Sequence, residues 1–310
     1  MGLGIVSYER IGKRFSISDV LSDCVEVIRL FQESVAPIYR AAGADPQQGS
    51  IADEELASTS SKELLETAFS QSGMLTESAA DIAYAFTKSL TDPVQTIAPW
   101  TLARAVLEPA ALGLWLLDLS ITATVRLQRS FAFRFEGLLQ QQRFCRSVDQ
   151  ATIADAVGKR IADVERKAIA AGFKPLWDKG GKRPGIGLVM PNVTDIVAQT
   201  LSREWLYRIL SGAAHGHFWA LNNLSFELVA SKGATFQTET RSGVKVHQME
   251  KGLSPLNVQG LSAEVLRSLS MLIWARFRLF GWDRTSLEQL LEDSFDRMGI
   301  RNPSARFWRQ

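Results

Sequence analysis

Apolar side chains recur at helical spacing along most of this chain of 310 residues. Between about residues 18 and 40, apolar positions three and four apart form one broad face, and later segments repeat the pattern. The alternation of apolar and polar residues that is typical of strands occurs only near residues 235–249, on both sides of Arg241-Ser242-Gly243. The pattern predicts a mainly α protein, a helical bundle with a small β-hairpin insertion near 235–249.

Caps and helix-breaking residues give the expected helix limits. The polar stretch 41–50, the turn Thr91-Asp92-Pro93 and Gly281 each interrupt the periodicity. Residues 172–192 are predicted to be a loop, in which Gly180-Gly181-Lys182-Arg183 suits either phosphate contact or a plain surface turn. The expected helices are 18–40, 51–70, 76–90, 101–116, 122–146, 150–171, one from about 192 through 215, a continuation over 218–231, 261–280 and 286–298.

The same interruptions suggest three parts of the chain. Residues 1–95 are predicted to be an N-terminal helical region, and residues 96–300 hold the strongly apolar helices of the main bundle. Residues 301–310 form a basic and aromatic tail, with three arginines beside Phe307 and Trp308.

Charge is unevenly distributed although the net value is only +2. Residues 1–125 hold 8 basic and 16 acidic side chains, whereas residues 126–183 hold 13 basic and 6 acidic ones. These two parts would complement each other across a dimer, and the basic part would equally suit a polyanion. Ordinary solvated helix faces explain the same distribution.

Composition indicates a globular protein of a reducing compartment. Apolar residues make up 46% and charged residues 22% of the chain. Cys24 and Cys145 lie too far apart in sequence to indicate a metal or redox pair, so the expected localisation is cytoplasmic. The most apolar run, 109–125, is too short to span a membrane and contains Asp118, so we expect buried helices and no membrane association.

The stretch with the most side chains suited to binding or catalysis lies between residues 203 and 217, which hold two of the three histidines. On a helix, Glu204, Arg208, Ser211 and His215 fall on one side, because their spacings are four, three and four. The opposite side is apolar. A polar stripe of this composition is a candidate site.

Three kinds of chemistry fit this stripe poorly. A metal site would need His215, His217 and His247, but residues two apart on a helix point about 200° apart, and no carboxylate stands at ligand spacing. Ser211 has no nucleophile elbow around it, and the chain has no Asp-rich motif of the terpene-cyclase kind. We therefore expect neither a metal nor another cofactor.

Two further sets of charged residues are open to two interpretations. Arg104 and Glu108 are four apart on an apolar helix, so they either pair structurally or share a pocket with Arg208. Arg126 and Arg129 alternate with phenylalanines, which suits phosphate contact and base stacking as well as packing of arginine stems over core aromatics.

The spacing of Arg208 and His215 carries a family resemblance. It is similar to the motif of HEPN-type domains, in which four to six residues separate an arginine from a histidine. The string Tyr207 to Gly216 also resembles bacterial helical proteins with a Tyr-Arg-x-Leu-Ser…His-Gly core. Their upstream helix is similar to 104–108 here, followed by Trp-Leu-Leu-Asp as at 115–118. The resemblance covers about residues 100–280.

This resemblance implies a HEPN-like bundle that acts as a metal-independent ribonuclease of the toxin or defence type. His215 would be the general acid and base, and Arg208 would hold the phosphate. Glu204 would orient Arg208, and Ser211 would hydrogen-bond locally. The expected partners are RNA or a nucleotide, a second copy in a homodimer, and a neutralising protein. The expected substrate contacts come from Arg104, Glu108, Arg126, Arg129, Tyr207 and His217.

The alternative is a non-catalytic helical module that binds a nucleotide, a small anion or a protein partner. In that hypothesis Arg104, Glu108, Arg208 and His215 form a buried polar network that fixes how the helices pack. The environment of His215, open to solvent or sealed in a core, separates the two hypotheses.

Overall fold

The computed structural model describes residues 17–181, 184–224, 226–228, 239–241, 244–246, 249–251 and 254–299. Most of these residues are helical, which confirms the predicted mainly α class. The helices are α1 (Ile17–Ala42), α2 (Ile51–Ser58), α3 (Lys62–Ser89), α4 (Ala98–Leu116), α5 (Ala123–Ser147), α6 (Ala151–Ala170), α7 (Val193–Leu201), α8 (Glu204–Ala214), α9 (Phe218–Leu224), α10 (Pro255–Phe280) and α11 (Thr285–Arg297).

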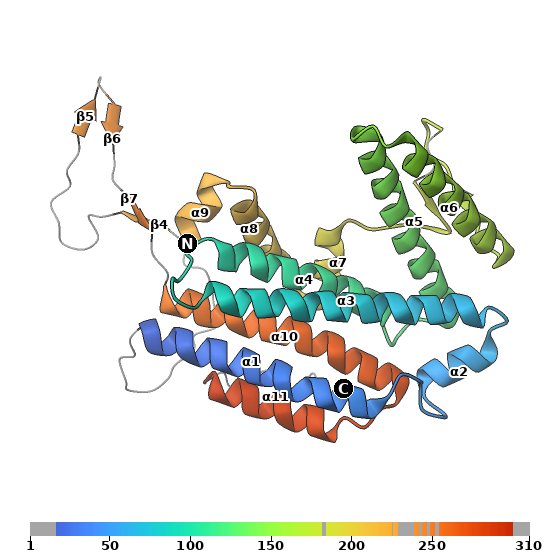
Figure 1. Cartoon of the computed structure of the whole chain (residues 1–310), viewed down its shortest axis with the longest axis horizontal. Coiled ribbons are helices and arrows are strands. Elements are labelled where there is room, and N and C mark those ends of the chain that lie inside the picture. Colours follow the sequence, from blue (N-terminus) through green and yellow to red (C-terminus); the bar gives the residue numbers. More distant parts are fainter. Residues whose placement is uncertain are drawn as a thin grey trace.

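Five long helices lie side by side and form the main bundle (Figure 1). α3 packs along α4, α10 packs against α4, α3 and α1, and α11 covers α1. Their apolar faces meet in one continuous core, in which Phe31, Phe86, Leu107 and Phe277 are fully buried. α10 lies in the middle of this arrangement, which explains why its sequence is apolar on nearly every side.

The hairpin of α5 and α6 stands away from the bundle (Figure 1). Thr122 caps α5 by accepting a hydrogen bond from the Val125 amide. The first half of α5 packs against the bundle through the buried Phe131 and Phe135, and its second half packs mainly against α6. α8 and α9 lie together over α4, on the side of α7 that is away from the hairpin of α5 and α6.

Three small antiparallel sheets complete the described structure. The predicted hairpin is confirmed as β5 (Glu239–Arg241) paired with β6 (Val244–Val246). Sequence reasoning missed the other two sheets, because one is made of strands of only two residues and the other begins where the helical periodicity of residues 218–231 masks the strand. They are β1 (Pro175–Leu176), β2 (Gly185–Ile186) and β3 (Leu188–Val189) in the predicted loop, and β4 (Phe226–Leu228) paired with β7 (Met249–Lys251).

Helix limits in the N-terminal third differ from the prediction. The expected helix over 51–70 is divided, because α2 ends at Ser58 and α3 begins at Lys62. The sequence predicts a new helix at Thr76, yet α3 runs without a break from Lys62 to Ser89. Ser72 and Thr76 do not cap a helix, because their hydroxyls donate to the carbonyls of Phe69 and Ser72 inside the same helix. Such bonding lets buried serine and threonine occupy a helix interior.

A second difference lies around the predicted site. The expected single helix from 192 through 215 is divided into α7 and α8 by Ser202, which adopts a left-handed backbone conformation with φ of 54°. This break turns α8 relative to α7. The predicted continuation to residue 231 is also wrong, since α9 ends at Leu224 and β4 follows.

The expected boundary between residues 95 and 96 lies in the connection from α3 to α4, two helices that pack together. The N-terminal helices therefore share one core with the rest. The predicted tail, residues 301–310, lies outside the described residues, as do Lys182, Arg183 and His247. Within the described part of the chain, no helix is both long enough and apolar enough to cross a membrane.

The contact between α4 and α10 depends on Gly113. A Cβ added there would lie 2.5 Å from Cδ1 of Leu272, a side chain that is itself fully buried. We expect Gly113→Ala to lower the free energy of unfolding by about 1–3 kcal/mol, because the core must shift to accept it. Gly137→Ala is the matched control, since it lies in open space on α5 and should raise stability by about 0.5–1 kcal/mol. Urea denaturation followed by circular dichroism measures both; equal effects would contradict the close contact.

Candidate functional site

The candidate site is built on α8, whose end is fixed by a glycine turn. Gly216 has a left-handed φ of 71°, its amide donates to the Ala213 carbonyl, and the His217 amide donates to the Gly212 carbonyl at 2.8 Å. This pair of backbone hydrogen bonds is a Schellman motif. It holds His215 at the C-cap of the helix and places the imidazoles of His215 and His217 with ring centroids 6.1 Å apart.

The amphipathic character predicted for this helix is confirmed. Leu206, Ile209, Leu210 and Ala213 are buried against the bundle. On the outer side Glu204, Arg208 and His215 are exposed, and Ser211 is half-buried. Nε and Nη2 of Arg208 both lie 2.8 Å from Oε1 of Glu204, and the Arg208 side chain is 63% exposed. The orienting contact expected between Glu204 and Arg208 is thus present.

Exposed aromatic residues surround this polar stripe, and sequence reasoning did not include them in the site. Trp205, Phe218 and Trp219 are each at least half exposed. The Trp219 indole lies over Gly212, where an added Cβ would be 2.8 Å from Cζ2. Trp205 also borders a surface hollow of about 440 Å³ beside Arg208, together with Ala198 and Ser202. The sequence signal for this surface was Trp205 next to the polar stripe of α8, together with the adjacent Phe218 and Trp219 at the start of α9.

The structure places Arg104 and Glu108 with Tyr207 and not with Arg208. Nη2 of Arg104 lies 2.7 Å from Oε1 of Glu108, and the Tyr207 hydroxyl donates to the same oxygen at 2.6 Å. Arg104 also lies over the Tyr207 ring and donates to its hydroxyl at 3.4 Å. The expected buried network of Arg104, Glu108, Arg208 and His215 is therefore wrong, because Tyr207 points to the bundle while Arg208 and His215 point to solvent.

The contact among Arg104, Glu108 and Tyr207 joins α8 to α4. The Tyr207 hydroxyl should therefore contribute to the stability of the fold. We expect Tyr207→Phe to lower the free energy of unfolding by about 1–3 kcal/mol, because a charge-assisted hydrogen bond is lost. Tyr84→Phe is the matched control, since this tyrosine is half exposed on α3 and should change stability by less than about 0.5 kcal/mol. Urea denaturation of both variants measures the difference, and equal midpoints would contradict a stabilising role for the hydroxyl.

The same hydroxyl predicts a pH effect. Burial raises the pKa of Tyr207, the hydrogen bond to Glu108 raises it further, and Arg104 only partly opposes them. A raised pKa in the folded chain means that this contribution to stability is complete below the ordinary tyrosine value and declines as the pH rises above about 10. Above about pH 10, the free energy of unfolding should decline less steeply with pH in Tyr207→Phe than in the wild type.

Arg126 and Arg129 were predicted to contact substrate, and the structure assigns both to the interior. The Arg126 side chain is fully buried and donates to both carboxylate oxygens of Glu55 and to the carbonyls of Leu116 and Asp118. Arg129 donates to the Trp115 carbonyl at 2.5 Å and to Asp118 at 3.1 Å. These carbonyls lie at and just beyond the C-terminus of α4, where cations are favourable. The structure thus supports core packing of these two arginines, and not contact with a phosphate or a base.

The described residues contain no group of three or more histidine, cysteine, aspartate or glutamate side chains that could hold a metal ion. Comparison of the chain with protein-family models, with curated proteins and with solved structures finds no match. The resemblance to HEPN-type domains therefore stays a prediction, and the exposed face of α8 must be interpreted from its own geometry.

Proposed function

We propose that the exposed face of α8 binds RNA and cleaves it without a metal ion. The observation that supports this proposal best is that Arg208 and His215 are both open to solvent on one side of the helix. A substrate can reach an exposed pair, whereas a buried pair would serve only the fold. The two residues are seven positions apart, which is about 10 Å along a helix axis, a distance that the long arginine side chain and a bound phosphodiester can bridge.

In the proposed reaction His215 accepts the proton of a ribose 2′-hydroxyl. The 2′-oxygen then attacks the neighbouring phosphorus, the bond from phosphorus to the 5′-oxygen breaks, and the leaving oxygen takes the proton back from His215. The products are a 2′,3′-cyclic phosphate and a free 5′-hydroxyl. Arg208 stabilises the charge that develops on the phosphoryl oxygens, and a guanidinium suits this role because it donates two parallel hydrogen bonds.

Two features of the surface are compatible with this substrate. The pair formed by Arg208 and Glu204 is exposed, and such pairs contribute at most about 1 kcal/mol, so a phosphate can displace the carboxylate. Trp205, Phe218 and Trp219 present ring faces on which unpaired bases can stack. Stacking requires bases that are not paired, so single-stranded RNA is the expected substrate.

The test is incubation of the full chain with end-labelled single-stranded RNA in EDTA. We expect cleavage by the wild type and a loss of about a hundredfold or more in Arg208→Ala, because one donor to the developing charge is removed. Arg29→Ala is the matched control, since Arg29 also forms an exposed ion pair with a residue four positions away, on α1. Intact RNA with the wild-type protein would refute the proposal, as would equal rates for the two arginine variants.

A second candidate function is non-catalytic docking of a protein partner, including a second copy of this chain. The same exposed tryptophans beside an arginine favour it, because tryptophan and arginine are enriched at the centres of protein interfaces. Sedimentation of the wild type beside Trp205→Ser tests the homodimer directly. A dimer that dissociates in the variant, together with RNA left intact, would support docking over cleavage.

A further inference from the structure

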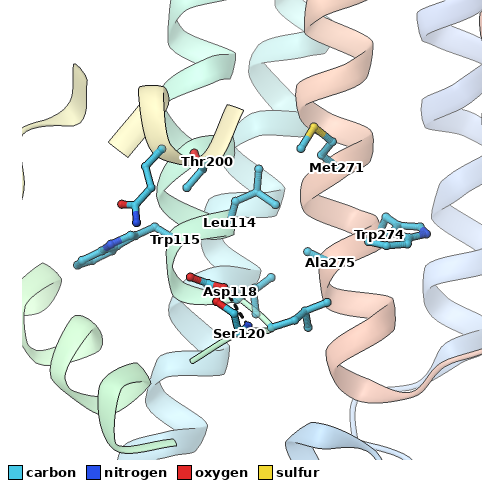
Figure 2. Close-up of a pocket in the computed structure, with 11 residues that line it drawn as sticks. Leu114, Trp115, Asp118, Ser120, Thr200, Met271, Trp274 and Ala275 are labelled. Atoms are coloured by element: carbon cyan, nitrogen blue, oxygen red, sulfur yellow. Dashed lines mark hydrogen bonds between the residues drawn. The ribbon is translucent and has the colours of Figure 1, made fainter. Parts of the chain in front are cut away.

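A separate cleft opens between α4, α7, α10 and the connection from α4 to α5 (Figure 2). Its volume is about 330 Å³, which is in the range of small-molecule sites. Figure 2 shows Trp115 and Trp274 on opposite sides, Thr200 at one end, and Asp118 with Ser120 at the other. Between them the lining is apolar, with Leu114, Met271 and Ala275.

The walls of the cleft are held in place from outside. Gly113 lets α10 approach α4 closely, because Leu272 fills the position where a side chain would stand. The guanidinium of Arg129 lies 5.1 Å from the Trp115 ring centroid, and those of Arg278 and Arg284 lie 4.8 and 5.8 Å from the Trp274 ring. Figure 2 shows both indoles directed away from the middle of the cleft, so these contacts fix the helices α4 and α10 that carry them. We therefore expect the space between the two helices to persist without a ligand.

The polar end of the cleft is selective. Oδ1 of Asp118 accepts hydrogen bonds from the Ser120 amide at 3.0 Å and hydroxyl at 2.6 Å, and Oδ2 accepts from Arg129 at 3.1 Å. The Asp118 side chain is still 29% exposed, so it can accept one more hydrogen bond. A ligand carboxylate would be repelled by Asp118. Because Arg129 already pairs with Asp118, a buried ligand cation would gain little from this carboxylate to offset the cost of its own desolvation, and this favours an uncharged donor.

We propose that this cleft binds a small molecule with an apolar chain and a terminal hydroxyl group, an aliphatic alcohol in its simplest form. The chain would lie against Leu114, Met271 and Ala275, and the hydroxyl would donate to Asp118. At about 30 Å³ for each water-sized group, the cleft holds about ten heavy atoms. The proposal does not depend on RNA cleavage, because the cleft and the exposed stripe on α8 use different residues.

The test is calorimetric titration of the whole 310-residue chain with 1-hexanol, 1-octanol and octanoate. We expect saturable binding of one alcohol per chain, with affinity rising about fourfold for each added methylene group. Octanoate should bind at least tenfold more weakly than 1-octanol. An absence of saturable binding of 1-octanol would overturn the proposal, and equal affinities for octanoate and 1-octanol would overturn the assignment of the polar end.

Variants separate this cleft from other apolar surface. Ala275→Leu fills the cleft and should weaken 1-octanol binding at least tenfold, whereas Ala170→Leu, the matched change at the exposed end of α6, should leave it unchanged. If circular dichroism shows that Ala275→Leu does not fold, Leu114→Ser at the half-buried rim should give the same loss. Undiminished binding in a folded cleft variant would place the alcohol elsewhere and overturn the proposal.

Discussion

Arg126→Met should lower the free energy of unfolding by about 3–5 kcal/mol, which is the expected effect of removing one partner of a buried ion pair. Arg126 is fully buried on α5, and its Nε and Nη2 lie 2.8 and 3.0 Å from the two carboxylate oxygens of Glu55 on α2. Methionine fills much of the same volume but leaves the carboxylate without its counter-charge. It also leaves the carbonyls of Leu116 and Asp118 without their donor.

Urea denaturation followed by circular dichroism measures this loss. Arg29→Ala, which breaks an exposed ion pair on α1, should change stability by at most about 0.5 kcal/mol. The double variant Glu55→Leu with Arg126→Met should recover part of the loss, because no unpaired charge remains. A single variant within about 1 kcal/mol of the wild type would show that this ion pair does not hold α2 to α5.

His215→Gln should reduce RNA cleavage by about two to four orders of magnitude, if the proposed reaction is correct. Glutamine keeps a hydrogen-bonding side chain of similar reach, but it cannot exchange a proton near neutral pH. Because His215 is exposed at the end of α8, its replacement should leave the fold intact. Activity and stability should therefore separate in this variant, whereas Arg126→Met should lose both.

Single-turnover cleavage in EDTA is the decisive experiment for His215, because it measures the chemical step apart from product release. His217→Gln is the comparison, because its imidazole is 6.1 Å away and is expected only to contact substrate. A rate for His215→Gln equal to that of the wild type would assign the chemistry to other residues.

Local sequence predicted the helices because their signals extend over many residues. Gly281 ends α10 and Thr122 begins α5, as expected from their capping preferences. Helix limits were predicted wrongly where the surrounding tertiary structure, and not the local sequence, decides whether a residue begins or breaks a helix. Thr76 has the composition of a helix start, but inside the bundle its hydroxyl bonds to its own helix. Ser202 breaks the predicted helix before α8, and serine carries no general preference for that conformation.

For the candidate site, the sequence by itself determined that Glu204, Arg208, Ser211 and His215 share one side of a helix, because that follows from helical periodicity alone. Only the tertiary structure decided which charged residues join them. Arg126 pairs with Glu55 and Tyr207 with Glu108, residues 71 and 99 positions apart. No local pattern encodes such pairings, since they depend on how separate helices pack. The same packing decides that Arg208 faces solvent and that a cleft remains between α4 and α10.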